Sequence, residues 1–547
     1  MISNLINAKC IFLFLLFCNS LISQAPPFIR SISPLINSSD KTVTITGINF
    51  PISSSNVNVS FGGVKGKIIS STNTQIISTV PSGALYRPIS IATNGLIGYY
   101  PFPFRLTYPN GGYITSSSFR KKIELPTKEL PKDIVVGDLN DDGLHEIIVS
   151  NSKNNSITIF VNSDKLLFTQ KFDLPTGISP QGIVIADVDA DGKNDILVAN
   201  QGSNTISIFK NILMYGQLAA ESFSPKYDLT VDERPNSIEV YDLERDGRND
   251  IIVSNENENT ISILRGLSAT QNTPLNFSQK ISLITQQRPR SISIGDIDRD
   301  GKADIVCVNE FSNSVSIFRN ISKRDSITTR SFAQRIDLLV GSKPKSVALA
   351  DINNDRRLDL IIAHSDEDYF SIIRNKSKPD TITVNTFEKQ TDYQTSGAQE
   401  DIAAADFDGD GRCDVGIVTG SNFLSLHKNS VGVSSNNLKS YINFTTGGGP
   451  IAMTVGDLDG DAQPEILTIN KGSNTISVFQ NRIGPPVITS MSPAIVTTGG
   501  TVLINGWHLS AVKKVFFGNI PAVNVTAIND SLVAAFIGKG GCGILKL

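Results

Sequence analysis

The stretch Gly295-Asp-Ile-Asp-Arg-Asp-Gly-Lys-Ala-Asp-Ile-Val306 carries the strongest structural signal in the chain, because its acidic core recurs with small variations. Successive copies start 49 to 55 residues apart. A repeat of this period is typical of propellers and other repeat arrays. The shared pattern is Asp-x-Asp-x-Asp-Gly-x-x-Asp, and its seven copies begin at Asp138, Asp187, Asp242, Asp296, Asp351, Asp406 and Asp457.

Each repeat is predicted to contain four β-strands. A segment such as Ser291–Gly295 runs into the acidic loop, and a segment such as Asp195–Asn200 leaves it. A third strand is expected at Asn204–Phe209, and a fourth at segments that begin with an aromatic residue, such as Phe277–Lys280. Four antiparallel strands in each of seven repeats predict an all-β fold with a seven-bladed β-propeller over residues 113–484.

The two ends of the repeat region fit together as a closed ring. A segment like a fourth strand, at 119–125, precedes the first acidic loop, and the last repeat ends after its third segment, at 475–481. Pairing between these segments would complete the last blade and leave no free strand edge. We therefore expect residues 119–125 to lie beside residues 475–481.

Two further domains are expected on either side of the repeats, at 26–110 and 485–547. Both begin with Pro-Pro and an alternating strand, and both contain Val-x-Phe-Gly, at Val59–Gly62 and Val515–Gly518. Alternation interrupted by Gly and Pro turns predicts immunoglobulin-like β-sandwiches. Only 11 residues follow Phe536, whereas the first copy continues for nearly 30 after the matching point, so the second sandwich is expected to be incomplete.

Residues 1–24 have the pattern of a secretory signal peptide. Lys9 supplies a positive charge, Ile11–Cys18 is an apolar run, and small residues follow. The run is too short to span a bilayer. The cysteines beyond it, Cys307, Cys413 and Cys542, are too scattered for a disulfide framework. We expect a protein that is secreted or at the cell surface after cleavage, with no transmembrane segment.

The acidic loops, numbered 1 to 7 in chain order, have the composition of calcium sites. Calcium takes about six to eight oxygen ligands from carboxylates, carbonyls and water. Positions 1, 3, 5 and 9 of each loop offer side-chain oxygens, position 7 offers its carbonyl, and Gly at position 6 permits a sharp turn. The predicted ligands are Asp138, Asn140, Asp142, Leu144 and Glu146 in loop 1; Asp187, Asp189, Asp191, Lys193 and Asp195 in loop 2; Asp242, Glu244, Asp246, Arg248 and Asp250 in loop 3; Asp296, Asp298, Asp300, Lys302 and Asp304 in loop 4; Asp351, Asn353, Asp355, Arg357 and Asp359 in loop 5; Asp406, Asp408, Asp410, Arg412 and Asp414 in loop 6; and Asp457, Asp459, Asp461, Gln463 and Glu465 in loop 7.

Two loops depart from the pattern, because Arg356 in loop 5 and Ala462 in loop 7 stand where the others have Gly. A residue with a side chain is strained where φ must be positive, so these two loops are expected to bind least tightly. An EF-hand is excluded, because position 12 is apolar, as at Val198, and predicted strands flank the loops.

Metal binding is favoured over a set of ordinary acidic turns. A lone Asp-Gly loop would be an unremarkable hairpin turn, but seven loops recur in register. Their predicted ligands include 26 of the chain's 52 acidic residues, four in each of loops 2, 3, 4, 6 and 7 and three in each of loops 1 and 5. Because like charges at this spacing repel, calcium, up to seven ions, is predicted to be part of the fold.

The flanking domains resemble the IPT/TIG family, on the paired openings and the Val-x-Phe-Gly motifs. The repeat region resembles the FG-GAP/VCBS repeats of integrin α-subunit propellers and of bacterial secreted proteins, on Gly295–Val306 and Asn204–Phe209. These resemblances imply an extracellular, calcium-loaded propeller that serves adhesion or ligand recognition. Together with the signal-like segment, they imply a bacterial secreted or cell-surface protein.

The function predicted from the sequence is non-catalytic binding of an extracellular protein or polysaccharide, on the face opposite the acidic loops. Basic residues in the expected loops of that face suit an anionic ligand, although solvated loop tips would look the same. No catalytic motif stands out. A polysaccharide lyase and a purely structural surface element stay open as alternatives, and no nucleic-acid partner is expected. The basic residues are Lys128, Lys132, Arg234, Arg288, Arg290, Lys343 and Lys345.

Overall fold

The computed structural model describes most of the chain. The predicted signal peptide, Cys542 and the end of the chain at Leu547 lie outside the described residues. No helix in the described part is long and apolar enough to cross a membrane. The described residues are 25–53, 57–108, 114–214, 216–268, 275–430, 438, 441–483, 486–507, 509, 512–529, 531–538 and 545–546.

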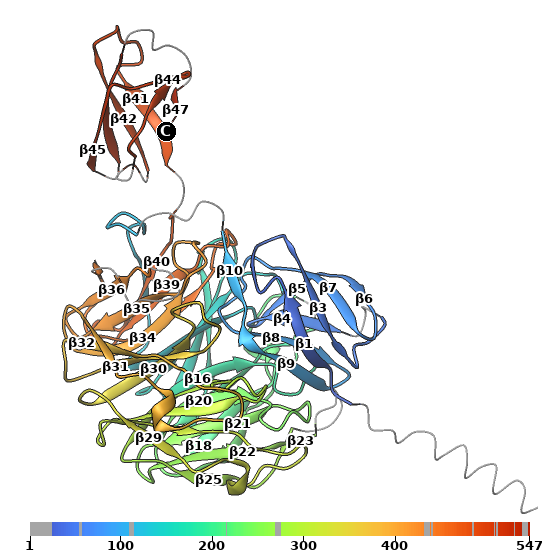
Figure 1. Cartoon of the computed structure of the whole chain (residues 1–547). Coiled ribbons are helices and arrows are strands. Elements are labelled where there is room, and N and C mark those ends of the chain that lie inside the picture. Colours follow the sequence, from blue (N-terminus) through green and yellow to red (C-terminus); the bar gives the residue numbers. More distant parts are fainter. Residues whose placement is uncertain are drawn as a thin grey trace, which may run out of the picture.

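The repeat region forms seven four-stranded antiparallel sheets. Neighbouring sheets pack through their innermost strands, and the last innermost strand contacts the first, so the sheets close into a propeller (Figure 1). From the inner strand outward, the first four sheets are β12 (Pro131–Gly137), β13 (Glu146–Asn151), β14 (Ser156–Val161) and β15 (Gln170–Pro175); β16 (Pro180–Ala186), β17 (Asp195–Asn200), β18 (Thr205–Phe209) and β19 (Tyr227–Thr230); β20 (Pro235–Tyr241), β21 (Asp250–Asn255), β22 (Thr260–Leu264) and β25 (Ile281–Ile284); and β26 (Pro289–Gly295), β27 (Asp304–Asn309), β28 (Ser314–Phe318) and β29 (Ile336–Leu339). The other three are β30 (Pro344–Ala350), β31 (Asp359–His364), β32 (Tyr369–Ile373) and β33 (Thr391–Gln394); β34 (Gln399–Ala405), β35 (Asp414–Thr419), β36 (Phe423–His427) and β37 (Ile442–Thr445); and β38 (Pro450–Gly456), β39 (Glu465–Asn470), β40 (Thr475–Phe479) and β11 (Ile123–Pro126).

The predicted ring closure is confirmed. Strand β11 pairs antiparallel with β40, with Ile123 opposite Val478, and Phe119 forms a bridge with Asn481. The first part of the repeat region therefore supplies the outer strand of the last sheet. This arrangement joins both ends of the propeller in one sheet, which then has four strands like the others.

The prediction for the fourth strands is wrong by a few residues. The strand expected from Phe277 begins at Ile281, and the one expected from Phe332 begins at Ile336. Phe332 is instead buried and forms an isolated bridge with Asn320. The aromatic residue therefore anchors the segment before the strand rather than opening the strand.

The hydrophobic core lies between adjacent sheets. Each second strand, such as β27, is buried along its whole length, since it is covered on both faces by neighbouring sheets. One cluster joins Ile148 and Ile159 of the first sheet to Ile183 and Ile196 of the second, and similar clusters join other neighbouring sheets. Face-to-face packing of this kind explains why the second strands are nearly continuous runs of apolar residues.

Both flanking regions form β-sandwiches, as predicted. In Figure 1 the N-terminal sandwich lies against the propeller, and the C-terminal sandwich stands at the end of a connecting segment. The N-terminal strands are β1 (Phe28–Ser33), β2 (Ile36–Ser38), β3 (Thr42–Ile48), β4 (Asn58–Phe61), β5 (Val64–Gly66), β6 (Ile68–Ser71), β7 (Gln75–Thr79), β8 (Pro88–Thr93), β9 (Leu96–Pro103) and β10 (Arg105–Thr107). The C-terminal strands are β41 (Val487–Ser492), β42 (Thr501–Trp507), β43 (Phe516–Phe517), β44 (Ile520–Pro521), β45 (Asn524–Asn529), β46 (Leu532–Phe536) and β47 (Leu545–Lys546).

Short elements decorate the outer edge of the propeller. A two-stranded ribbon is inserted in the chain between the third and the outer strand of the third sheet, and three single 3₁₀ turns precede outer strands. Cys307 and Cys413 are free and buried, so the described residues contain no disulfide. The short elements are β23 (Gly266–Ser268), β24 (Asn276–Phe277), η3 (Ala220–Ser222), η4 (Thr329–Ser331) and η5 (Val384–Thr386).

Candidate metal sites and the central channel

All seven acidic loops connect an inner strand to the second strand of the same sheet, and position 9 is the first residue of that second strand. Loop 4 shows the shared geometry. The Asp296 carboxylate accepts hydrogen bonds from the backbone N–H groups of Asp300 (3.1 Å) and Gly301 (3.0 Å). Asp304 accepts one from Ile297 N–H (2.9 Å). In every loop the backbone N–H of position 6 donates to the carboxylate of position 1, and the N–H of position 2 donates to the carboxylate of position 9.

Carboxylates converge in five loops, where three ligand oxygens lie within 4.8 Å of one another. These are not the five loops that have the complete sequence pattern, because loop 7 is included and loop 1 is not. Loops 1 and 5 carry Asn140 and Asn353 at position 3, which offer an amide oxygen in place of a carboxylate. The converging groups are Asp187, Asp189 and Asp195; Asp242, Glu244 and Asp246; Asp296, Asp298 and Asp300; Asp406, Asp408 and Asp414; and Asp457, Asp459 and Glu465.

Several loop oxygens are buried without a hydrogen-bond partner among the described residues. They are Oδ1 of Asp138, Oε1 of Glu146 and Oε2 of Glu244. A buried, unpaired carboxylate oxygen is unfavourable unless a donor or cation satisfies it. A hard divalent cation binds such oxygens, so the residues present fit a metal ion. The carbonyl ligands at position 7 remain a prediction.

Burial makes the loop carboxylates weak acids. It raises the pKa of Asp296 to about 7, with Asp300 and Asp298 raising it further and the Gly301 N–H opposing the shift. Burial likewise raises the pKa of Glu146 to about 8 and that of Glu465 to about 10, where Asp459 adds to the effect. A bound divalent cation would favour the ionised forms and release protons.

The turn of each loop needs left-handed backbone at two positions. The Gly residues at position 6 have φ between 82° and 91°, and Arg356 and Ala462 in the same place have φ of 65° and 70°. The expectation of a positive φ in loops 5 and 7 is therefore confirmed. Position 4 is also left-handed in all seven loops, with φ from 56° to 76°, which the sequence pattern did not indicate.

A basic residue at the end of the third strand pairs with the carboxylates at positions 3 and 5. In loop 4, Arg319 Nε lies 2.6 Å from Asp298 Oδ2 and its Nη2 lies 3.4 Å from Asp300 Oδ2. In four loops a protein cation therefore offsets part of the repulsion between the carboxylates. The sequence signal is a base directly after the third strand, and the residues are Lys210, Arg265, Arg319 and Lys428.

The N-terminal sandwich is seated on the acidic-loop face of the propeller. Asn194 in loop 2 donates to the Gly63 carbonyl (2.8 Å), and Ile97 N–H donates to the Gly247 carbonyl of loop 3 (2.8 Å). Lys65 pairs with Asp141 of loop 1 (2.6 Å). Further contacts reach loops 5 and 6, so the sandwich spans the ring. Nothing in the sequence pattern predicted this docking.

Arg105 makes the most buried of the described ion pairs between the sandwich and the propeller. Its Nη2 lies 3.4 Å from Asp351 Oδ2, with 8% and 7% of the two side chains exposed. Its Nη1 donates to the Gly411 carbonyl of loop 6 (2.9 Å) and also bonds Asn354. Asp351 is the predicted position-1 ligand of loop 5. The loop predicted to bind calcium weakly therefore already holds a protein cation beside its first carboxylate.

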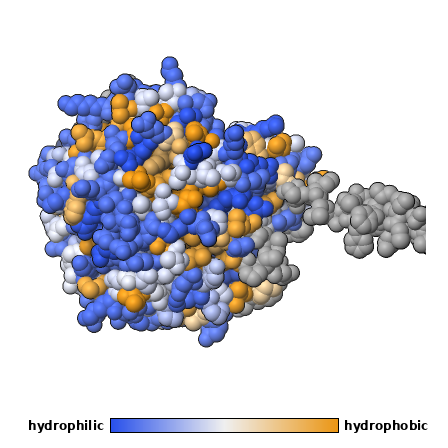
Figure 2. Space-filling view, turned by 90° about the horizontal axis from the view of Figure 1, so that it is seen from below, coloured by the Kyte–Doolittle hydropathy of each residue, from blue (hydrophilic) through white to orange (hydrophobic). Residues whose placement is uncertain are grey.

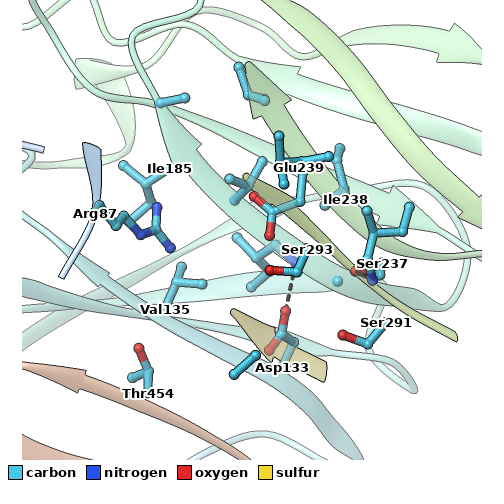
Figure 3. Close-up of a pocket in the computed structure, with 18 of the residues that line it drawn as sticks. Arg87, Asp133, Val135, Ile185, Ser237, Ile238, Glu239, Ser291, Ser293 and Thr454 are labelled. Carbon is cyan, nitrogen blue, oxygen red and sulfur yellow. Dashed lines mark hydrogen bonds between the residues drawn. The ribbon is translucent and has the colours of Figure 1, made fainter. Parts of the chain in front are cut away.

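The propeller encloses a central channel of about 910 Å³, lined by the inner strands and, on the acidic-loop side, by the N-terminal sandwich. Figure 3 shows Arg87 of the sandwich, Asp133 and Glu239 at this pocket. Tyr99 of the sandwich stacks on Tyr241 of β20, with ring centroids 4.5 Å apart. The sandwich thus forms one end of the channel, and the other end opens among the loops that were predicted to be basic.

Carboxylates lie beside most of the basic residues that were named for the open face. Arg234 lies 3.5 Å from Glu256, and Arg288 and Arg290 lie 3.2 and 3.0 Å from Glu310. Carboxylates also pair with Lys128, Lys343 and Lys345. Lys132 differs, because no described residue forms an ion pair with it. The sequence alone did not show that carboxylates of neighbouring loops reach these bases.

Comparison with known families agrees with this geometry. A profile of FG-GAP-like repeats matches six overlapping windows, each running from one acidic loop to just past the next, at residues 138–198, 187–253, 242–307, 296–362, 351–417 and 406–468.

This chain belongs to the FG-GAP-like repeat family.

Its flanking sandwiches match the IPT/TIG domain at residues 27–118 and 486–540. We found no significant match to this FG-GAP-like protein among curated proteins. Similar solved structures include BBS1N in complex with ARL6DN, at 14% identity and a TM-score of 0.45, covering 67% of this chain and 98% of that one. Another is an auxiliary nutrient binding protein from Bacteroides ovatus, at 10% identity and a TM-score of 0.37, covering 84% and 98%. FG-GAP repeats and IPT/TIG domains are typical of extracellular proteins.

Proposed function

We propose that this FG-GAP-like protein is a calcium-stabilised, secreted or cell-surface protein that binds an extracellular ligand without catalysis. Recognition takes place on the propeller face opposite the acidic loops. The observation that carries the proposal is the position of the N-terminal sandwich, which occupies the acidic-loop face through Arg105, Lys65 and Ile97. The opposite face keeps the channel mouth and its rim open to a partner.

Calcium has a structural part in this proposal. The acidic loops join neighbouring strands at the covered face, away from the open rim. A cation held there would fix the turn between the inner strand and the second strand of each sheet. Its binding energy would add to the stability of the folded propeller.

The rim supports recognition of a polar partner. Acidic and basic side chains alternate there in ion pairs, and Arg288 lies over the exposed ring of Phe311, 4.5 Å from its centroid. Figure 2, a view of the molecule from below, shows hydrophobic residues scattered among hydrophilic ones on that side as well. A mixed surface of this kind fits an extracellular protein or polysaccharide better than a broad apolar partner.

Blocking the open face tests the proposal. Ile178, an exposed residue in a loop of that face, is replaced by Cys and coupled to polyethylene glycol. Glu221, exposed on the outer edge of the propeller, is the matched control. The variants are applied in calcium buffer to an array of glycans and matrix proteins. We expect array signals to be lost with the label at 178 and kept with the label at 221. Equal signals from both, or none from the unlabelled protein, would leave a structural role as the better account.

A polysaccharide lyase is the second candidate, because Glu239 in the channel has no ion-pair partner among the described residues and Lys132 has a lowered pKa. Burial, followed by the charge of Lys471, lowers the pKa of Lys132 to about 8, which suits a general base. Incubation with acidic polysaccharides distinguishes the two candidates. The binding proposal expects no new chain ends, and their appearance would favour the lyase.

A further inference from the structure

Glu239 lines the channel and differs from the other carboxylates there in having no partner in the described part of the chain. It is the fifth residue of β20, and no described residue lies within hydrogen-bond or ion-pair distance of its side chain. Burial raises its pKa, and the charge of Arg87 opposes the shift. No contact with a described residue therefore explains why a carboxylate occupies this position. The other inner strands carry small or apolar residues at the fifth position, namely Val135, Val184, Ser293, Ala348, Ala403 and Thr454.

The other carboxylates that line the channel have partners among the described residues. Asp187 belongs to loop 2, Glu256 pairs with Arg290, and Glu400 pairs with Lys345. The remaining two accept hydrogen bonds from the next sheet. Asp133 accepts a hydrogen bond from Ile183 N–H of the next sheet (2.8 Å), and Asp401 accepts one from Met453 N–H (2.9 Å). Both occupy the third position of an inner strand, where side chains join one sheet to the next. Glu239 is therefore the carboxylate that the walls of the described channel leave free for a ligand.

Arg87 brings a positive charge into the same space from the N-terminal sandwich. It lies between β7 and β8, and Figure 3 shows it at the pocket with Glu239. Its side chain has no hydrogen-bond or ion-pair partner among the residues that the structure describes. The two domains together thus place in the channel one cation and one carboxylate that have no partner among the described residues.

The mouth of the channel has two further unpaired cations. Lys132 and Lys471 line the pocket, and neither forms an ion pair with a described residue. The positive charges of Lys471, Arg290 and Lys345 help to lower the pKa of Lys132, after burial. An anion bound at the mouth would relieve this repulsion.

We propose that the channel binds a small acidic sugar, whose anionic group meets Lys132 and Lys471 and whose hydroxyl groups reach Glu239 and Arg87. The cavity of about 910 Å³ has the size of a small-ligand pocket. Its walls add the hydroxyl groups of Ser293 and Thr454. A polyhydroxylated anion is the ligand class that uses every unpaired group. The inference rests on the proposed function only in that the ligand enters from the open face.

Calorimetric titration with four sugars of similar size tests the inference: glucuronate, glucose 6-sulfate, glucose and glucosamine. The folded, calcium-loaded protein is expected to bind at least one of the two anionic sugars and neither of the others. A preference between carboxylate and sulfate identifies the anionic group. Lys132→Ser with Lys471→Ser, and separately Glu239→Val, should each weaken binding by about tenfold or more. Val is the residue that β12 and β16 carry at this position, so the second variant fits the fold.

Matched changes outside the channel are the controls. Lys165→Ser with Lys389→Ser, and separately Glu221→Gln, remove the same charges from exposed positions beside outer strands and should leave affinity unchanged. The inference is overturned if none of the four sugars binds, or if the channel variants bind as well as the controls. Array binding that depends on the label at 178 would still support the proposed function in that case, so the two failures are distinguishable.

Discussion

Removing calcium is expected to lower the melting temperature of this protein, and to lower it more at about pH 8 than at about pH 5. Each site saturated at about a hundred times its Kd contributes about 2.7 kcal/mol to stability. Several loops contribute together, so the total effect should be large. The measurement is thermal melting in calcium and in EDTA at matched ionic strength, and excess calcium added to the EDTA sample should restore the transition.

The pH dependence follows from the loop carboxylates. Without a cation, the folded-state pKa is about 7 for Asp296 and about 8 for Glu146, whereas an unfolded carboxyl group titrates near 4. Between these values the folded, calcium-free chain binds more protons than the unfolded chain, so its stability falls as pH rises. Calcium keeps the ligands ionised and removes this loss. Melting temperatures that are equal in calcium and EDTA at both pH values would contradict the account.

Arg105→Ala is expected to destabilise the contact between the N-terminal sandwich and the propeller by about 3–5 kcal/mol. The change leaves Asp351 buried without its partner and removes the bond to the Gly411 carbonyl. Hydrogen exchange should rise at the backbone amides of loops 5 and 6, and the melting temperature should fall.

Lys65→Ala is the control for Arg105, because its pair with Asp141 is partly exposed. Exposed pairs contribute only about 0–1 kcal/mol, so this variant should behave almost like the parent protein. If Arg105→Ala is as stable as Lys65→Ala and its loops 5 and 6 exchange at the same rate, the sandwich is not held to the propeller in the way described.

The features predicted correctly are those in which the partners are close in sequence or repeat in register. All side-chain ligands of a loop, such as Asp296 to Asp304, lie within nine residues, so spacing alone indicated their convergence. Ring closure was predictable from one surplus strand at the start and one missing strand at the end, because unpaired strand edges are disfavoured. The left-handed backbone at Arg356 followed from the Gly that other loops have in its place.

The features that were missed depend on residues far apart in the chain. Arg105 and Asp351 are separated by 246 residues and belong to different domains, so no local pattern joins them. The ion pairs between Arg288 or Arg290 and Glu310 depend on how neighbouring loops fold over the rim. The position of Arg87 in the channel follows from domain docking, which sequence spacing does not encode.

Calorimetric titration of the chelator-treated protein with calcium tests the central claim most directly, since the account assigns the acidic loops to calcium. The five loops with converging carboxylates predict at least five calcium ions per chain. Asp298→Asn with Asp300→Asn in loop 4 should remove one of them, whereas Asp173→Asn on the outer strand β15 should remove none. No calcium uptake by the folded protein, or an unchanged stoichiometry in the loop 4 variant, would contradict the account.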